Sequence, residues 1–312
     1  GLSKKISIDN LKKMIKTIKG LSQAKKIIKE FNPDIVIGTG GYICGAVILS
    51  AHKLKIPTML HESNAFPGKA VKMLTKYTDI IMISFDNARN YIQKAKKVVL
   101  TGTPIKIDST AMTEERKKEI LREQNLKQEK PLVLIFGGSQ GAQKINEAVI
   151  ELLSQNSELE YQIILSAGGK QYDDVIGELG NRNIDISKNK NIRIYPYIYN
   201  MNELEKAADV IVCRSGATTV AEIATIGKPA IFIPLPNVSN DHQTYNAKVL
   251  ADLGVAKIIK NEELNGKILD ENIKGYIKDN YKIKEIGEKA KKVSINNAEE
   301  RIYSEIMKII DK

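Results

Sequence analysis

Two kinds of hydrophobic periodicity, one typical of strands and one of helices, alternate along most of the chain. From about residue 33 onward, short runs rich in β-branched residues are bounded by Gly, Pro, Asp or Ser, and longer stretches with helical spacing separate them. This alternation is typical of a parallel sheet whose strands are joined by crossover helices. We expect ten strands, at 34–38, 58–61, 79–84, 98–101, 132–136, 162–166, 192–195, 209–213, 230–233 and 255–259.

A break in the pattern at residues 102–104, Gly-Thr-Pro, divides these strands into a set of four and a set of six. The chain has 312 residues, more than one hydrophobic core usually organises. We therefore expect an α/β protein with domains at 1–106 and 107–281, followed by a basic helical tail at 282–312. Four strands are few for a doubly wound domain, so we expect the first domain to be incomplete at its N-terminal end.

The first thirty residues combine helical periodicity with concentrated positive charge. Apolar residues recur at three- and four-residue spacing between positions 11 and 31, and lysines occupy the positions between them. Residues 1–30 hold nine lysines and two acidic residues, whereas the whole chain carries a net charge of +11. Two interpretations stay open: a surface helix with a solvated lysine face, or a helix that lies on an anionic membrane surface.

Composition argues against several classes of protein. No uncharged apolar run approaches the ~20 residues of a membrane-spanning helix, and the N-terminus does not resemble a signal peptide. Cys44 and Cys213 cannot form a disulfide framework, and three histidines argue against a zinc site. With no Trp and five Phe, the chain offers little aromatic surface for nucleic acid, so we expect no such partner.

A glycine-rich turn follows the strand expected at 132–136. Residues 137–142, Gly-Gly-Ser-Gln-Gly-Ala, stand at its carboxyl end and open a helical pattern. Glycines allow a ligand to approach the backbone, and the free N–H groups of a helix start favour an anion, so phosphate binding is one interpretation. A purely structural turn is a second. The G-x-S-x-G match is a third, which would make Ser139 a nucleophile with His242 as its base.

The same arrangement recurs after the strand at 209–213. There Arg-Ser-Gly precedes Ala217, Thr218 and Thr219, whose hydroxyl groups suit either phosphate oxygens or helix capping. Glu222, one turn into the helix, can accept hydrogen bonds from a ribose diol. Two glycine turns at strand ends therefore predict one diphosphate site.

Polar segments follow three further strands. Residues 240–246 place amides and an imidazole past the strand at 230–233, where they suit sugar hydroxyls or hydrogen bonds within the loop. Residues 38–42, Gly-Thr-Gly-Gly-Tyr, follow the first strand, but Ile43 stands where a dinucleotide-binding fingerprint requires Gly. Residues 61–64, His-Glu-Ser-Asn, end the second strand at the edge where open α/β sheets bind ligands, with helix capping as the alternative for Asn64.

Together and in this order, these segments resemble the MurG family over essentially the whole chain. The resemblance rests on residues 38–45, 61–64, 102–104, 137–142, 213–222 and 241–246. It implies the GT-B arrangement, two Rossmann-like domains with parallel sheets. The first domain would bind the acceptor and the membrane, the second would bind a UDP-sugar donor, and the tail would pack back on the first.

The resemblance implies an inverting glycosyltransferase that moves N-acetylglucosamine from UDP-N-acetylglucosamine to undecaprenyl-diphospho-N-acetylmuramoyl-pentapeptide. This step converts lipid I to lipid II in peptidoglycan synthesis and so serves cell wall biogenesis, cell shape and cell division. We expect a peripheral protein at the cytoplasmic face of the cell membrane, with no metal and no other cofactor. The residues implied are Lys106, Ser139, Ile198, Ala217, Thr218, Thr219, Glu222, Gln243 and Asn246 for the donor, and Gly40, Gly41, Tyr42 and Asn64 for the acceptor.

The chain departs from the family pattern at several positions. Lys106 stands where the family usually has Arg, Ser63 where it commonly has Gln, and Ala46 where it commonly has Pro. The family's first glycine loop, G-G-T-G-G-H, is not among residues 1–312, and its His is a favoured candidate for the catalytic base. The base is therefore unknown, with His61 and Glu62 as candidates.

Other functions stay open at this level. Donor motifs are shared by other GT-B enzymes of UDP-sugars, such as an epimerase or a glycolipid glycosyltransferase. A serine hydrolase would use Ser139 and His242, and a catalytically impaired fragment or a membrane-associated binding protein would bind the donor without transfer.

Overall fold

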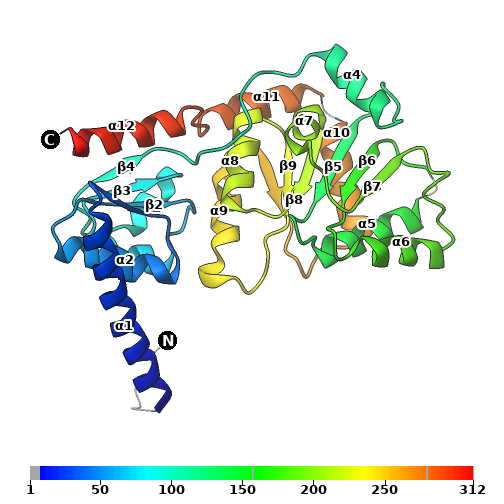
Figure 1. Cartoon of the computed structure of the whole chain (residues 1–312). Helices are drawn as coiled ribbons and strands as arrows, with labels where there is room; N and C mark the ends of the chain where they lie inside the picture. Colours follow the sequence, from blue (N-terminus) through cyan, green and yellow to red (C-terminus); the bar gives the residue numbers. More distant parts are fainter. Residues whose placement is uncertain (1–7, 157, 279, 312) are drawn as a thin grey trace. The chain divides into compact units, whose positions relative to one another are not determined.

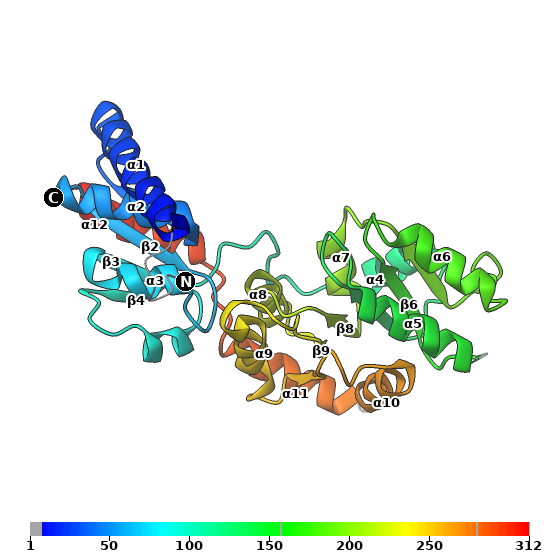
Figure 2. The ribbon, with the colours of Figure 1, turned by 90° about the horizontal axis from the view of Figure 1, so that it is seen from below.

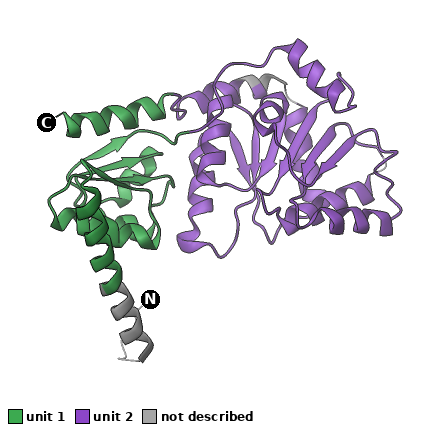
Figure 3. Cartoon of the chain, viewed as in Figure 1, with its two compact units in different colours: residues 1–104, 297–312 green, residues 105–296 purple. Residues whose placement is uncertain are grey.

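The computed structural model describes residues 8–156, 158–278 and 280–311, with side-chain descriptions that leave out residues 8–18, 280–282 and 284. The chain forms two compact units, residues 1–104 with 297–312 and residues 105–296 (Figure 3). Each unit is an α/β structure with a wholly parallel sheet, so the predicted fold class is confirmed.

Unit 1 contains a four-stranded sheet in the order β1-β2-β3-β4. The strands are β1 (Val36–Gly38), β2 (Thr58–Glu62), β3 (Ile80–Ile83) and β4 (Val98–Leu100), and the helical elements are α1 (Ile8–Phe31), α2 (Gly41–Lys53), α3 (Lys69–Leu74), η1 (Thr75–Tyr77), η2 (Asp86–Tyr91) and α12 (Ala298–Ile310). All four strands lie within a few residues of their predicted positions. Successive strands pair in parallel, so their carboxyl ends meet at one edge of the sheet (Figure 1).

Both faces of the unit 1 sheet are covered. Leu60, Ile81 and Ile83 point to the face that packs on α2, where Ile48 is fully buried. Side chains of alternating positions point the other way, because successive residues of a strand face opposite sides. On that second face, apolar residues of α12 pack on Met59, Ile80 and Met82, and these are Ile302, Ile306 and Ile309.

Unit 2 contains a six-stranded sheet in the order β10-β9-β8-β5-β6-β7. Its strands are β5 (Leu132–Phe136), β6 (Gln162–Ser166), β7 (Ile192–Tyr195), β8 (Val210–Cys213), β9 (Ala230–Phe232) and β10 (Ala256–Ile258), close to the predicted ranges. The chain runs outward from β5 through β6 to β7, and then from β8 through β9 to β10 on the other side. The neighbours β5 and β8 therefore flank the point where the strand order reverses, which is where open parallel sheets bind ligands.

The helices of unit 2 form two groups. α5 packs against α6 and α10, whereas α8 packs against α7, α9 and α11 (Figures 1 and 2). The helical elements are α4 (Glu114–Glu123), α5 (Gln143–Gln155), α6 (Tyr172–Asn181), α7 (Met201–Ala207), α8 (Ala217–Ile226), η3 (Ser239–Asp241), α9 (His242–Ala251), α10 (Gly266–Ile277) and α11 (Asn280–Lys291).

The C-terminal stretch divides differently from the predicted tail at 282–312. Gly287 of α11 lies against Gly227, where a β-carbon on Gly227 would come within 3.1 Å of the Gly287 α-carbon. This close approach places α11 with α8 in unit 2. Only residues 297–312 join unit 1, because α12 carries the isoleucines that cover its sheet.

The basic first helix is longer than predicted, and its apolar residues are not all buried. Ala24 and Ile28 are buried, whereas Ile27 is 63% exposed and Phe31 is 79% exposed. The predicted positions between 8 and 18 lie outside the described side chains. Within the described residues, the helices are too short or too polar to span a membrane.

Candidate functional site

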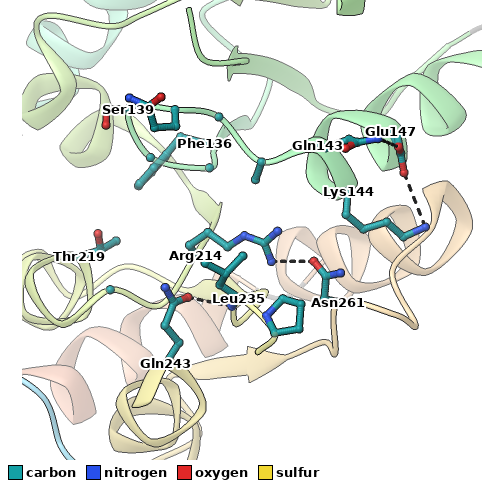
Figure 4. Close-up of a pocket in the computed structure, with 17 residues that line it drawn as sticks. Phe136, Ser139, Gln143, Lys144, Glu147, Arg214, Thr219, Leu235, Gln243 and Asn261 are labelled. Atoms are coloured by element: carbon teal, nitrogen blue, oxygen red, sulfur yellow. Dashed lines mark hydrogen bonds and ion pairs between the residues drawn. The ribbon is translucent and has the colours of Figure 1, made fainter. Parts of the chain in front are cut away.

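A cavity of about 700 Å³ in unit 2 is lined by both glycine-rich turns (Figure 4). It lies where β5 and β8 end, at the reversal of strand order. Of the predicted donor residues, Ser139, Thr219 and Gln243 line it. The turn after β9 and the residue Asn261, past β10, complete its wall.

The turn after β5 is shaped by close backbone packing. Gly138 and Gly141 have φ angles of +88° and +77°, which side chains other than glycine rarely adopt. A β-carbon on Gly141 would lie 2.1 Å from the carbonyl oxygen of Ala167. Ala142 at the N-cap of α5 has no side-chain group that could cap the helix, and its carbonyl oxygen accepts from the Ile145 N–H, so the N–H groups of Gln143 and Lys144 are open to a ligand.

The turn after β8 leads into α8 in a similar way. Its N-cap is Gly216, which lines the cavity and has no side chain to cap the helix. The capping alternative for Thr218 and Thr219 is therefore not what the structure shows, since both residues lie inside α8. Two uncapped helix N-termini border one cavity, and the partial positive charge of each favours an anion there.

Arg214 lines the cavity and connects the ends of three strands. Its Nη1 donates hydrogen bonds to the carbonyl oxygens of Ile233 (2.9 Å) and Pro234 (3.2 Å) and to Oδ1 of Asn261 (2.8 Å). Burial lowers the pKa of the Arg214 guanidinium from its usual value. Our sequence reasoning missed Arg214 and Asn261. A charged residue directly after a buried strand was the available signal for Arg214.

Two polar residues at the start of α9 lie in different surroundings, one in the cavity lining and one buried. Gln243 Oε1 accepts a hydrogen bond from the backbone N–H of Leu235 (2.9 Å), and Gln243 reaches the cavity. Asn246 is fully buried, and its Nδ2 donates to the Ser215 carbonyl oxygen (3.2 Å). In this structure the Asn246 side chain therefore supports the turn after β8 and is not among the residues that line the cavity.

The serine hydrolase interpretation lacks its geometry. Ser139 is exposed on the turn after β5, and the Nδ1 atom of His242 is hydrogen-bonded to the Ser239 carbonyl oxygen (2.9 Å). Among the described residues, no hydrogen bond joins Ser139 to His242. A serine nucleophile requires an adjacent base, so the G-x-S-x-G match is better explained as a glycine turn.

Six of the nine predicted donor residues lie outside the cavity lining, among them Ile198, Lys106 and Glu222. Ile198 is buried, Lys106 is exposed, and Glu222 is half-buried. Burial raises the pKa of the Glu222 carboxyl. Close by, Glu205 of α7 is 2% exposed, and burial together with the charge of Glu222 raises its pKa to about 8.

The predicted acceptor residues of unit 1 lie at the carboxyl ends of β1 and β2. Gly40 and Gly41 have φ angles of +96° and +83°, and they lead to Tyr42, whose side chain is fully exposed. Asn64 follows β2. The next helix, α3, has Gly68 at its N-cap, so Asn64 does not cap it.

Both candidate bases in unit 1 are buried and hydrogen-bonded. The Nε2 atom of His61 lies 2.9 Å from the Gly102 carbonyl oxygen. The Glu62 carboxylate accepts hydrogen bonds from the Asn64 N–H (2.9 Å), the Asn64 Nδ2 (3.0 Å) and the Gly68 N–H (2.7 Å). These contacts tie Glu62 to its own loop and orient the Asn64 amide.

Comparisons with known families cover nearly the whole chain. Residues 1–83 match the model of the glycosyltransferase family 28 N-terminal domain, and residues 132–302 match that of the family 28 C-terminal domain. A protein of Acetivibrio thermocellus is 42% identical over all of this chain and 82% of its own length. One of Caldanaerobacter subterraneus is 40% identical over 97% of this chain and 82% of its own. Both are named UDP-N-acetylglucosamine–N-acetylmuramyl-(pentapeptide) pyrophosphoryl-undecaprenol N-acetylglucosamine transferase.

Solved structures of MurG and of related folds are also similar to this chain. The crystal structure of Acinetobacter baumannii MurG is 30% identical and has a TM-score of 0.77, covering 94% of this chain and 79% of its own. A UDP-GlcNAc 2-epimerase from Neisseria meningitidis is 15% identical with a TM-score of 0.65, covering 98% of this chain and 83% of its own. At that identity the epimerase supports the fold alone.

Proposed function

The chain belongs to the MurG family within glycosyltransferase family 28, and from this premise we propose that it transfers N-acetylglucosamine from UDP-N-acetylglucosamine to undecaprenyl-diphospho-N-acetylmuramoyl-pentapeptide. This reaction makes lipid II from lipid I in peptidoglycan synthesis. The proposal rests on one observation of this chain: two helix N-termini without side-chain caps border the same cavity of unit 2.

This arrangement suits the leaving group of the reaction. When the sugar departs from UDP, negative charge grows on the diphosphate, and fixed N–H dipoles aimed at that charge lower the barrier. The first N–H groups of α5 and α8 and the hydroxyls of Ser139 and Thr219 supply such donors. Arg214 adds a fixed positive charge near them, and Gln243 offers an amide to the hydroxyl groups of the sugar.

The nucleoside half of the donor has its own proposed contacts. Glu222 would accept hydrogen bonds from the ribose hydroxyls, Ile198 would border the uracil, and Lys106 would face the diphosphate. These three lie outside the cavity lining, so their assignment rests on the family resemblance. Ala217 and Thr218 complete the first turn of α8, and Asn246 acts through the Ser215 carbonyl that it binds.

Acceptor binding is proposed for the carboxyl edge of the unit 1 sheet. Gly40, Gly41 and the exposed Tyr42 form one part of it, and Asn64 forms another. An inverting displacement needs a base for the acceptor hydroxyl. The Glu62 carboxylate accepts three hydrogen bonds from its own loop, so we propose that Glu62 holds the shape of that loop. The catalytic base stays unassigned.

The lipid acceptor requires contact with a membrane, and α1 is the proposed element. Its described part exposes Lys25, Lys26 and Lys29 together with the apolar side chains of Ile27 and Phe31. Exposed apolar groups among lysines suit the surface of an anionic bilayer. We therefore propose a peripheral position at the cytoplasmic face of the cell membrane.

A transfer assay tests the proposed function. The chain is incubated with UDP-N-acetylglucosamine labelled in the sugar and with the polyprenyl-diphosphate acceptor in mixed micelles, and the label is followed into the lipid phase. The proposal predicts labelled lipid and an equal amount of released UDP. Conversion of the donor to another UDP-sugar without labelled lipid would instead identify an epimerase and would contradict the proposal.

A further inference from the structure

The loop at 137–142 has little of its own to fix its shape. Three of its six residues are glycines, and a hydrogen bond from the Gly141 N–H to the Gly138 carbonyl oxygen (2.9 Å) closes its turn. Glycine-rich backbone has many accessible conformations. A group outside the loop must therefore select one of them if Ser139 is to meet a ligand in a constant geometry.

Two side-chain amides supply this constraint. Asn146 of α5 is 3% exposed, and its Nδ2 donates to the Ala167 carbonyl oxygen (2.9 Å) and to Oε1 of Gln171 (2.9 Å). Gln171, directly before α6, donates from Nε2 to the Gln140 carbonyl oxygen (3.1 Å). Among the described residues, this is the one side-chain hydrogen bond that the loop receives.

The hydrogen bonds also fix the direction of each amide. Asn146 Nδ2 carries two hydrogens, and both are used. Gln171 must therefore turn its oxygen to Asn146, which leaves its nitrogen for the Gln140 carbonyl. The buried Asn146 amide therefore determines that Gln171 presents its nitrogen, a donor, to the loop at 137–142.

Backbone packing joins the same two loops. A β-carbon on Gly168 would lie 2.3 Å from the backbone nitrogen of Gly141, so the loop after β6 lies directly against the loop after β5. Contacts this close limit independent movement of the two loops. The Gln171 amide adds to this packing a hydrogen bond that fixes the direction of the Gln140 carbonyl, next to Ser139.

We propose that Gln171, oriented by Asn146, is a positioning residue of the donor site, which holds the Gln140 carbonyl and thereby Ser139 in the geometry that receives a diphosphate. Neither amide lines the cavity, so both act through the loop. The inference rests on the proposed function, because it takes the loop at 137–142 as the diphosphate site.

Two variants of Gln171 test the proposal in the full chain. Gln171→Met keeps the length of the side chain and removes both hydrogen bonds without adding charge, so it decides the test. Gln171→Glu still accepts from Asn146, loses the donor to Gln140 and adds a negative charge near the loop. Gln124→Met is the control, because Gln124 is also half-buried, accepts a hydrogen bond from the Tyr195 hydroxyl and lies outside the cavity lining. For each chain, calorimetry gives the affinity for UDP, displacement gives that for uridine, and thermal unfolding gives Tm.

The proposal predicts a split between the two ligands. Both Gln171 variants should bind UDP about five- to tenfold more weakly and bind uridine as the unaltered chain does, with the control unchanged for both. UDP affinity within twofold of the unaltered chain for Gln171→Met would overturn the positioning role. Equal weakening for UDP and uridine with a lowered Tm would also overturn it, by showing a general structural role. Failure of the unaltered chain to bind UDP would instead overturn the proposed function.

Discussion

Glu62 shows how a residue at a predicted ligand edge acquires a different role. Its pattern at the end of β2 suggested a catalytic carboxylate, yet the carboxylate accepts three hydrogen bonds from residues 64 and 68. Those bonds depend on loop geometry that spacing in the sequence does not reveal. The same holds for His61, whose partner Gly102 is forty-one residues away.

Replacing Glu62 by Gln should weaken the loop and leave the donor site intact. The amide nitrogen of Gln cannot accept the N–H groups that the carboxylate now receives, so we expect a loss of about 1 to 3 kcal/mol in the free energy of unfolding. Urea denaturation measures this loss, and calorimetry with UDP checks the donor site. Unchanged stability, or weaker UDP binding, would contradict the loop assignment.

Glu205 predicts a dependence of stability on pH. Its pKa is raised to about 8 from 4.5, so the folded chain keeps a proton that the unfolded chain releases between these values. The stability of the folded state therefore falls as pH rises through this window, and the penalty is complete above about pH 8. Glu205→Gln removes the titration, so its stability relative to the unaltered chain should rise between pH 5 and pH 9 by on the order of 3 kcal/mol.

Glu203→Gln is the matched control on the same helix. Glu203 pairs with Arg116 at 2.8 Å, and this hydrogen bond lowers the pKa of its carboxyl. Its replacement should bring no gain in stability at high pH. If Glu205→Gln and Glu203→Gln respond alike in denaturation experiments across this pH range, the buried state of Glu205 is contradicted.

At the scale of elements, the sequence was most informative about strands. All ten appear within a few residues of their predicted ranges, because short β-branched runs between Gly, Pro and Asp mostly form strands in an α/β chain. The helices at the C-terminus were less predictable. The amphipathic patterns of α11 and α12 look alike in sequence, and only tertiary packing assigns α11 to unit 2 and α12 to unit 1.

The packing of α12 predicts unequal effects for two isoleucines on that helix. Ile306 packs on the sheet of unit 1, whereas Ile310 is 42% exposed. Ile306→Ala should lower the free energy of unfolding of unit 1 by about 1 to 3 kcal/mol, because apolar contacts with Met59, Ile80 and Met82 are lost. Ile310→Ala should change it by less than about 1 kcal/mol. Hydrogen exchange of β2 and β3 measures both, and equal effects would contradict this docking of α12.

The lysines of α1 predict membrane binding that depends on charge. Replacing Lys25, Lys26 and Lys29 by Gln should weaken binding to anionic vesicles by tenfold or more, since each lysine near such a surface contributes about 1 kcal/mol before screening. The control replaces three exposed lysines of unit 2, Lys118, Lys127 and Lys190, and so keeps the net charge equal. Co-sedimentation at low and high salt is the measurement. Equal binding by both triple variants would contradict the proposal that α1 binds the membrane and would leave it an ordinary solvent-exposed helix.

At the scale of the whole molecule, the chain passes from unit 1 to unit 2 after residue 104 and returns at residue 297. The predicted donor motifs belong to unit 2, and the predicted acceptor motifs belong to unit 1. Sequence reasoning could separate them because each motif directly follows a strand, and strand order places it on a ligand edge. The sequence carries a signal for Arg214, a charged residue directly after a buried strand, but none for Asn146 or Gln171, because the partners of these two amides come from other loops.

Binding of the donor to unit 2 is tested most directly by a calorimetric titration of the chain with UDP-N-acetylglucosamine, repeated for Glu222→Ala and for Glu203→Ala. We expect one saturable site, a loss of about 1 to 3 kcal/mol in binding free energy for Glu222→Ala, and no loss for Glu203→Ala. Absence of saturable binding by the unaltered chain would contradict the assignment of unit 2 as the UDP-sugar site, and equal affinity of the Glu222→Ala chain would contradict the contact of Glu222 with the ribose.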